Sequence, residues 1–336
     1  MSWFQRLPKV ELHVHLEGAI PHEALWKLIQ KYGGDPSVPD LDALRRRFRY
    51  RNFSHFIKTW SWKNGFLREY EDFRMIAEVT ARDLVAQNVR YAEMFFSPSL
   101  FVRRGLEVQR LTEAVRAGLD RAEGIRVGLI ADLVRDYGPK AEARTLARLK
   151  EVKDQGVIGI GIGGSEKPFP PEPFEPLYRE ARRSGFHTNA HAGEAAGPES
   201  IWGAIERLEV ERIGHGTRTR EDPALLGYLT EMQIPLEMCP VSNLRTGVVE
   251  RLAEHPIREY FGRGIPVTVN TDDPKMFDTS LAHEYRALVE QCGFSRREIC
   301  RLILTAVEFS WLPSKRKRSL AESFTRDPAW VGEPMS

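Results

Sequence analysis

Short runs of β-branched and apolar residues recur along the whole chain, and polar sequence follows each run. Between most of the runs, apolar residues are spaced three and four positions apart, a pattern typical of amphipathic helices. The runs predict eight strands, at residues 10–14, 89–96, 125–133, 157–162, 186–192, 211–216, 234–239 and 265–271.

Alternating strands and helices predict a parallel sheet with right-handed crossovers, and eight such units predict closure into a barrel. A doubly wound open sheet is the alternative. The chain has no GxGxxG motif opening a helix and no P-loop, so the nucleotide-binding forms of the open sheet lose support. We therefore expect one α/β domain over residues 1–336, a (β/α)8 barrel of the TIM type.

One long interruption, residues 18–88, separates the first two predicted strands. A helix here would carry Phe53, Phe56, Ile57 and Trp60 on one face. That face could simply pack into the core. Alternatively, an insertion that begins at the C-terminal end of the first strand would cover the barrel mouth, and its aromatic face would pack over a flat apolar ligand. We expect a helical lid of the second kind, with Phe56 and Trp60 as substrate contacts.

The composition is that of an ordinary globular protein, with 42% hydrophobic and 29% charged residues. Lys plus Arg (49) nearly balance Asp plus Glu (47), so nothing indicates a nucleic-acid partner. No apolar run reaches the roughly 18 residues of a membrane span, and the N-terminus lacks the apolar stretch of a signal peptide. Three scattered cysteines do not make a disulfide framework. We expect a cytoplasmic protein.

The main charge run, residues 315–318, lies in a C-terminal segment, 313–336. Four basic residues could contact nucleic acid or a membrane. The sequence around them favours a solvated C-terminal extension instead.

Four of the predicted strands place polar residues where metal chemistry would need them. The first strand carries two histidines two positions apart, which therefore point the same way. The residues concerned are His13 and His15, His191 on the fifth strand, His215 on the sixth, and Asp272 and Asp273 after the eighth. Strand C-termini open onto one face of a barrel, so these side chains should converge. Imidazoles with one carboxylate suit zinc or a similar divalent ion. Buried polar residues without a metal are the alternative, but each would need its own hydrogen-bond partner.

Glu194 follows His191 by three residues, on the loop that leaves the fifth strand. A carboxyl group placed there could face a ligand without touching the metal and act as a general acid. A loop-bracing role is the alternative.

The segments PKVELHVHLEGAI, NAHAGE, RIGHGT and VTVNTDDP resemble the signature segments of the adenosine and adenine deaminase family within the amidohydrolase superfamily. The resemblance runs from about residue 7 to 290. It implies zinc-dependent hydrolytic removal of an amino group, with one zinc ion per chain. The implied ligands are His13, His15, His191 and Asp272.

The same resemblance implies roles around the substrate. Glu194 would protonate the purine ring nitrogen next to the amino-bearing carbon, and His215 would orient the attacking water and help deprotonate it. The resemblance also implies a catalytic role for Asp272. The implied substrate contacts include His15, the backbone N–H of Gly164, and Asp273 against the five-membered ring.

Two features disagree about which adenine compound is used. Glu17, in HLEG, resembles the free-base enzymes, because adenosine-specific members usually carry Asp there; the longer Glu could instead reach a different 5′-substituent, as in an aminodeoxyfutalosine deaminase. Gly164 resembles the nucleoside enzymes, and Ser97 stands where free-base enzymes carry an acid. We expect adenosine or a 5′-substituted adenosine as substrate, with adenine and aminodeoxyfutalosine as alternatives.

Two further interpretations belong to other classes. An inactive barrel that only binds a ligand would be favoured if a metal ligand or Glu194 were missing, and none is. A two-metal hydrolase of the phosphotriesterase type would need a bridging lysine after the fourth strand. Lys167 is available, but it lies several residues beyond the predicted strand end. The sequence leaves the oligomeric state open.

Overall fold

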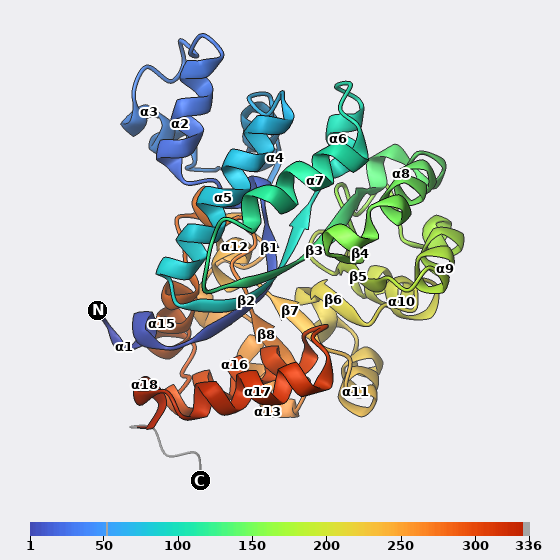
Figure 1. The fold of residues 1–336 in the computed structure, drawn as a ribbon. Coiled ribbons are helices and arrows are strands. Elements are labelled where there is room, and N and C mark those ends of the chain that lie inside the picture. The colour runs from blue at the N-terminus through green and yellow to red at the C-terminus, as the bar shows by residue number, and fades with distance from the viewer. Residues whose placement is uncertain (52, 332–336) are drawn as a thin grey trace.

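The computed structural model describes residues 1–51 and 53–331. Eight strands form a sheet in sequence order, and every neighbouring pair is parallel (Figure 1). The strands are β1 Lys9–His15, β2 Val89–Phe96, β3 Arg126–Val134, β4 Val157–Gly163, β5 His187–Ala192, β6 Arg212–His215, β7 Leu236–Met238 and β8 Val267–Val269. Each one overlaps a strand predicted from the sequence.

Residues just beyond β8 close the sheet against β1. Val14 forms a parallel bridge to Asp272. The N–H of His15 donates to the carbonyl of Asp272 at 2.8 Å, and the N–H of Asp272 donates to the carbonyl of His13 at 3.0 Å. The predicted (β/α)8 barrel is therefore confirmed, and its seam lies among the predicted metal ligands.

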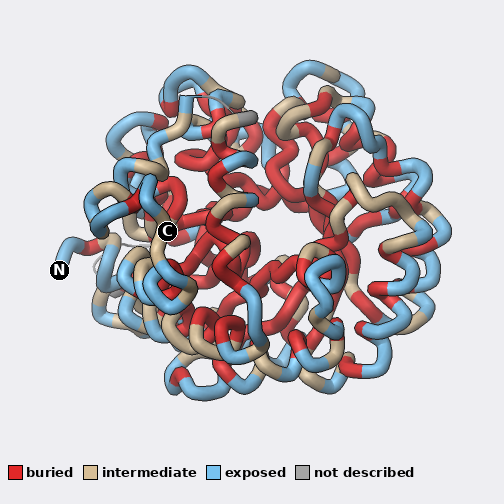
Figure 2. The backbone as a smooth tube through the Cα atoms, turned by 90° about the horizontal axis from the view of Figure 1, so that it is seen from above, coloured by how far each residue is buried: buried red, intermediate tan, exposed pale blue. Residues whose placement is uncertain are grey.

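Helices surround the strands. They are α1 Trp3–Arg6, α2 His22–Lys31, α3 Leu41–Arg47, α4 Phe53–Asn64, α5 Tyr70–Ala86, α6 Pro98–Val102, α7 Val108–Leu119, α8 Pro139–Glu151, α9 Glu175–Arg183, α10 Pro198–Glu206, α11 Pro223–Met232, α12 Pro240–Arg245, α13 Ile257–Arg263, α14 Pro274–Phe277, α15 Leu281–Gln291, α16 Arg296–Phe309, α17 Ser314–Thr325 and α18 Pro328–Val331. Seen from above, buried residues gather around the barrel centre and exposed residues lie at the periphery (Figure 2). No helix in the described ranges is long and apolar enough to cross a bilayer.

The insertion between β1 and β2 contains helices of two kinds. Figure 1 shows α2, α3 and α4 at the end toward which the strand arrows point. By contrast, α5 packs along α7 in the outer ring, so the predicted range 18–88 includes one ordinary barrel helix. On α4, Phe56 is buried and Ile57 is 39% exposed, while the side chain of Phe53 lies outside the described ones.

The C-terminal segment differs from the prediction of a solvated extension. Phe324 on α17 and Trp330 on α18 are buried, and the Trp330 indole donates to the Cys300 sulfur at 2.7 Å. Lys315, Arg316 and Arg318 are exposed, as predicted. The segment is therefore exposed along its basic residues, whereas the two aromatic residues that follow them add apolar surface to bury.

Candidate active site

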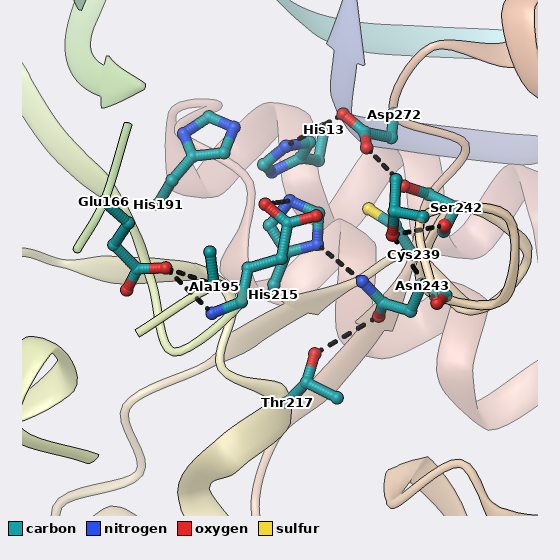
Figure 3. Close-up of polar contacts among 12 residues, drawn as sticks. His13, Glu166, His191, Ala195, His215, Thr217, Cys239, Ser242, Asn243 and Asp272 are labelled. Carbon is teal, nitrogen blue, oxygen red and sulfur yellow. Dashed lines mark hydrogen bonds and ion pairs between the residues drawn. The ribbon is translucent and has the colours of Figure 1, made fainter. Parts of the chain in front are cut away.

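Four side chains from distant parts of the chain meet at the C-terminal end of the barrel (Figure 3). They are His13 on β1, His191 on β5, His215 at the end of β6 and Asp272 after β8. One ligand atom from each lies within 4.8 Å of the others. The convergence expected from the strand ends is therefore present, and this group could hold a metal ion.

The three imidazoles of this group are held through their Nδ1 atoms, His215 by Asn243 as described below. His13 Nδ1 lies 2.8 Å from Glu237 Oε2, and His191 Nδ1 lies 3.1 Å from the carbonyl oxygen of Ile162. Such partners orient an imidazole so that its other nitrogen can face a metal. The Nε2 atom of His13 is buried and has no hydrogen-bond partner among the described residues.

His215 and Asp272 have left-handed backbones, with φ of +63° and +62°. A residue other than glycine adopts this conformation at a cost of about 1 kcal/mol or more, and such strain clusters at functional sites. Both side chains are braced. The Asn243 amide lies 3.1 Å from His215 Nδ1, and the Ser242 hydroxyl donates to Asp272 Oδ2 at 2.6 Å, which leaves Oδ1 toward the histidines.

His15 lies at the edge of the same group. Its Nε2 atom is 3.2 Å from His191 Nε2 and 3.4 Å from Asp272 Oδ1. The four residues whose ligand atoms lie within 4.8 Å of one another, however, include His215 and not His15. The assignment of His15 as a ligand and of His215 as the residue that orients water stays a prediction.

The protonation states favoured by the site fit a divalent cation. Burial lowers the pKa of His13, His15 and His215 well below the usual range and that of His191 to about 4, so the imidazoles are neutral. Burial, with help from Glu194, raises the pKa of Asp272 to about 8. A cation among these groups would hold the carboxylate ionised and satisfy the unpaired His13 nitrogen.

Glu194 sits on a loop that a second acid holds in place. The Glu166 carboxylate accepts the backbone N–H groups of Gly193, Glu194, Ala195 and Ala196 at 2.6, 3.2, 2.7 and 2.9 Å. The Glu194 carboxyl lies 3.7 Å from His215 Nε2. Burial, and then Glu166 and Asp273, raise the pKa of Glu194 to about 8, so at neutral pH it carries a proton that it can donate.

A cavity of about 750 Å³, counted with the open space at its mouth, adjoins this cluster. It is lined by His15, Phe56, Ile57, Trp60, Ser97, Leu100, Asp132, Val134, Gly163, Gly164, Glu166, His191, Glu194, His215, Asp272 and Asp273. Of the predicted substrate contacts, only Glu17 is not in this lining. Its Oε1 atom accepts the backbone N–H of Ser97 at 3.0 Å, so Glu17 lies behind the cavity wall.

Two glycines allow the backbone to pack closely against acidic side chains at the site. Trp60 of α4 donates its indole N–H to Asp273 Oδ1 at 3.2 Å. A Cβ atom on Gly18 would come within 1.7 Å of the same oxygen, so only glycine fits there. Gly164 has a φ of +105°, and a Cβ atom there would lie 2.2 Å from Asp136 Oδ2. Both glycines are therefore required by the shape of the site.

Three acids at the site escaped the analysis of the sequence: Asp132, Glu166 and Glu237. Asp132 and Glu237 are single acids inside otherwise apolar strands, and this pattern is a signal that could have found them. Glu166 carries no such signal, because it lies in a polar loop. Lys167 is exposed beside it and does not line the cavity, so it is not placed to bridge two metals.

A barrel that gathers histidines, an aspartate and a protonated glutamic acid around one cavity has the parts of a metal-dependent hydrolase. Comparison with known families agrees. The family model described as adenosine deaminase matches residues 8–326. The chain belongs to the adenosine deaminase family, whose members are hydrolases of C–N bonds, and it is a deaminase of adenine-type substrates.

Individual relatives carry different substrate names. The chain is 39% identical to an adenine deaminase of Bordetella avium, over 90% of this chain and 96% of the relative. It is 37% identical to an aminodeoxyfutalosine deaminase of Streptomyces avermitilis, over 98% and 94%. Its fold matches an amidohydrolase from Burkholderia ambifaria solved with bound zinc, with a TM-score of 0.89, 28% identity, and coverage of 99% and 94%.

Proposed function

We propose that this deaminase hydrolyses the 6-amino group of an adenine nucleoside, adenosine or a 5′-substituted adenosine, to an inosine-type product and ammonia. The observation that carries the proposal is the position of Glu194, a protonated acid beside the histidine and aspartate cluster at the base of one cavity. Adenine and aminodeoxyfutalosine stay the alternatives, since relatives bear both names.

One zinc ion per chain is the proposed cofactor, held by His13, His15, His191 and Asp272. The unpaired, buried Nε2 of His13 and the neutral imidazoles support a metal here, and nitrogen ligands with one carboxylate suit zinc. When bound, zinc would supply a Lewis acid that lets water attack near neutral pH.

The chain's own residues move the protons. Glu194 gives its proton to the ring nitrogen next to the amino-bearing carbon, which makes that carbon electron-poor and open to attack. His215 orients the attacking water and accepts one proton from it, and this proton passes to the amino group, which leaves as ammonia. The second proton of the water returns to Glu194 as the new carbonyl group forms. The 3.7 Å between His215 Nε2 and Glu194 Oε2 supports a mechanism in which both groups act on one carbon.

The remaining contacts hold the purine in the plane that this chemistry needs. Asp273, fixed by Trp60, faces the five-membered ring, and the backbone N–H of Gly164 faces the six-membered ring. Phe56 and Trp60 cover the ring from the insertion, as a lid. Ser97 lies toward the ribose, and Glu17 accepts its backbone N–H from behind the cavity wall.

Other parts of the proposal concern the setting of the enzyme. The balanced charge supports a small-molecule purine as partner rather than nucleic acid or a membrane. A cytoplasmic location is supported by the three cysteines, all of which are buried. An inactive barrel is disfavoured because the proposed ligands and the acid all come together at one cavity.

A substrate panel tests the proposal. Purified enzyme with measured zinc content would be offered adenosine, 2′-deoxyadenosine, 5′-deoxyadenosine, methylthioadenosine, aminodeoxyfutalosine and adenine, and the fall in absorbance near the adenine maximum recorded. We expect one zinc per chain and turnover of the nucleosides. Much faster turnover of adenine than of every nucleoside would contradict the nucleoside assignment.

A further inference from the structure

The proposed mechanism leaves one carboxyl group of the cavity without a role. Asp132, on β3, lines the cavity and is only 6% exposed. The Ser97 hydroxyl donates to its Oδ2 atom in a long contact of 3.4 Å. Its Oδ1 atom is buried and lacks any hydrogen-bond partner in the part of the chain that the structure describes. Buried polar atoms are seldom left unpaired, so this oxygen calls for a ligand.

The order of the strands around the barrel indicates which part of a purine lies beside Asp132. From Asp273 after β8, the wall passes β1, then Ser97 after β2, Asp132 on β3, Gly164 after β4 and Glu194 after β5. In the proposed function Asp273 faces the five-membered ring, Gly164 faces the six-membered ring, and Glu194 faces the ring nitrogen beside the amino-bearing carbon. Along the edge of a purine, N9 and its substituent lie between the five-membered ring and that side of the six-membered ring. The substituent on N9 therefore faces β2 and β3.

The neighbouring strand β4 leaves room for this carboxyl group. A Cβ atom on Gly163 would lie 2.7 Å from Asp132 Oδ2 and 3.0 Å from Oδ1. A Cβ atom on Gly161 would lie 3.6 Å from Oδ1. A larger residue at Gly163 would force the Asp132 carboxyl to move, so this part of the barrel wall is built around it.

The charge around Asp132 indicates the kind of group it accepts. The nearby Glu17 is also acidic, and its Oε2 atom is likewise buried and without a partner among the residues described. Burial, and then Glu17, raise the pKa of Asp132 well above its usual range. Arg135 and Lys63 lie near these acids and oppose the rise in their pKa, but the two buried oxygens without partners both belong to carboxyl groups. A phosphate would face these two acids, whereas a hydroxyl group can hydrogen-bond to a carboxyl group in either protonation state.

Building on the proposed function, we propose that Asp132 is the residue that selects the N9 substituent, by accepting a hydrogen bond from a ribose hydroxyl. Asp132 would accept a hydrogen bond from a donor group on the N9 side of the purine, and a ribose hydroxyl is one such donor. The N9–H group of free adenine is the other source of such a donor, and the experiment below separates the two.

The experiment measures kcat/KM of the zinc-loaded enzyme and of Asp132→Ala. The substrates form two sets, adenosine with its 2′-deoxy and 3′-deoxy forms, and adenine with 9-methyladenine. In the wild type we expect loss of one ribose hydroxyl to lower kcat/KM by about 10- to 100-fold, the effect of one hydrogen bond to a buried carboxyl group. In Asp132→Ala, kcat/KM for adenosine should fall to the wild-type value for the deoxy form that lacks this hydroxyl. The kcat/KM of Asp132→Ala for that deoxy form should equal the wild-type value.

Glu142→Gln is the matched control. Glu142 is another buried acid with an unpaired Oε2 atom, held beside β3 by the N–H of Val134, but it does not line the cavity. This variant should keep the wild-type preference among all five compounds. Asp132→Asn keeps one acceptor oxygen and should keep part of the preference, and it replaces Asp132→Ala if that variant does not fold.

Each contrary result has a distinct meaning. An equal loss of kcat/KM for all five compounds in Asp132→Ala would overturn the inference and leave the proposed function standing. A preference for adenine over 9-methyladenine that depends on Asp132, without one for adenosine over its deoxy forms, would overturn the assignment to ribose. Absence of turnover by the wild type on every compound would overturn the proposed function, and this inference with it.

Discussion

The two halves of the barrel mouth differ in how firmly the protein holds their polar side chains. The half formed by β5, β6, β8 and β1 carries the histidines and Asp272, and His13, His191, His215 and Asp272 are each held by a partner such as Glu237 or Ser242. The half formed by β2, β3 and β4 carries glycines, Ser97 and Asp132, whose Oδ1 atom has no partner in the described ranges. The comparison indicates that the first half is preorganised for the reaction and the second is left open for the substrate.

The largest effect is expected in the half that carries the reaction. His13→Ala removes a proposed metal ligand, so both bound zinc and turnover should be lost, by more than the roughly 10- to 100-fold cost of removing an outer partner of a ligand. Metal analysis of the purified variant with an activity assay checks this. His187→Ala is the control, because His187 lies on β5 but stacks on Trp311 away from the cluster. Full zinc content in His13→Ala would show that His13 is not a ligand.

An intermediate effect is expected at Glu166, which holds the loop that carries Glu194. In Glu166→Gln an amide group would oppose some of the four backbone N–H groups that the carboxylate now accepts. The loop that carries Glu194 should shift, and kcat should fall by roughly tenfold, since leaving buried donors unpaired costs about 1–3 kcal/mol. Zinc content should not change. An unchanged kcat with a lower melting temperature would make Glu166 purely structural.

The sequence predicted the half that carries the reaction better than the half that holds the substrate. His13, His191, His215 and Asp272 stand at strand ends, and a barrel brings strand ends together whatever lies between them. Strands such as β3 and β4 were predictable for a different reason, because buried parallel strands are nearly continuous apolar runs.

The substrate half depends on details that strand positions do not encode. Glu17 was predicted to contact substrate, but its side chain turns behind the cavity wall to the backbone of Ser97. Asp132 stands out in the sequence as a single acid in an apolar strand, but its unpaired oxygen and its close approach to Gly163 do not. Such features follow from side-chain packing, which only the folded chain reveals.

The smallest effect is expected at Glu17, on the substrate side. Glu17→Asp shortens a buried side chain that reaches the Ser97 backbone, so discrimination among 5′-substituents should change by a few fold while zinc content stays the same, since one neutral hydrogen bond contributes about 1 kcal/mol. The ratio of kcat/KM for adenosine and methylthioadenosine measures this. Loss of zinc in this variant would place Glu17 in the metal site instead.

Substitution of Glu194 separates the reaction from metal and substrate binding. Glu194→Gln keeps the shape of the side chain but removes the proton that the purine ring must receive. We expect full zinc content, unchanged binding of a purine analogue, and turnover lower by at least roughly 10²- to 10⁴-fold. In the wild type, kcat/KM should fall as the pH rises past the pKa of Glu194, about 8, because the acid is then ionised. The most direct test measures zinc content and turnover on one sample of Glu194→Gln. The account predicts full zinc with lost turnover, and near-normal turnover at full zinc would contradict it.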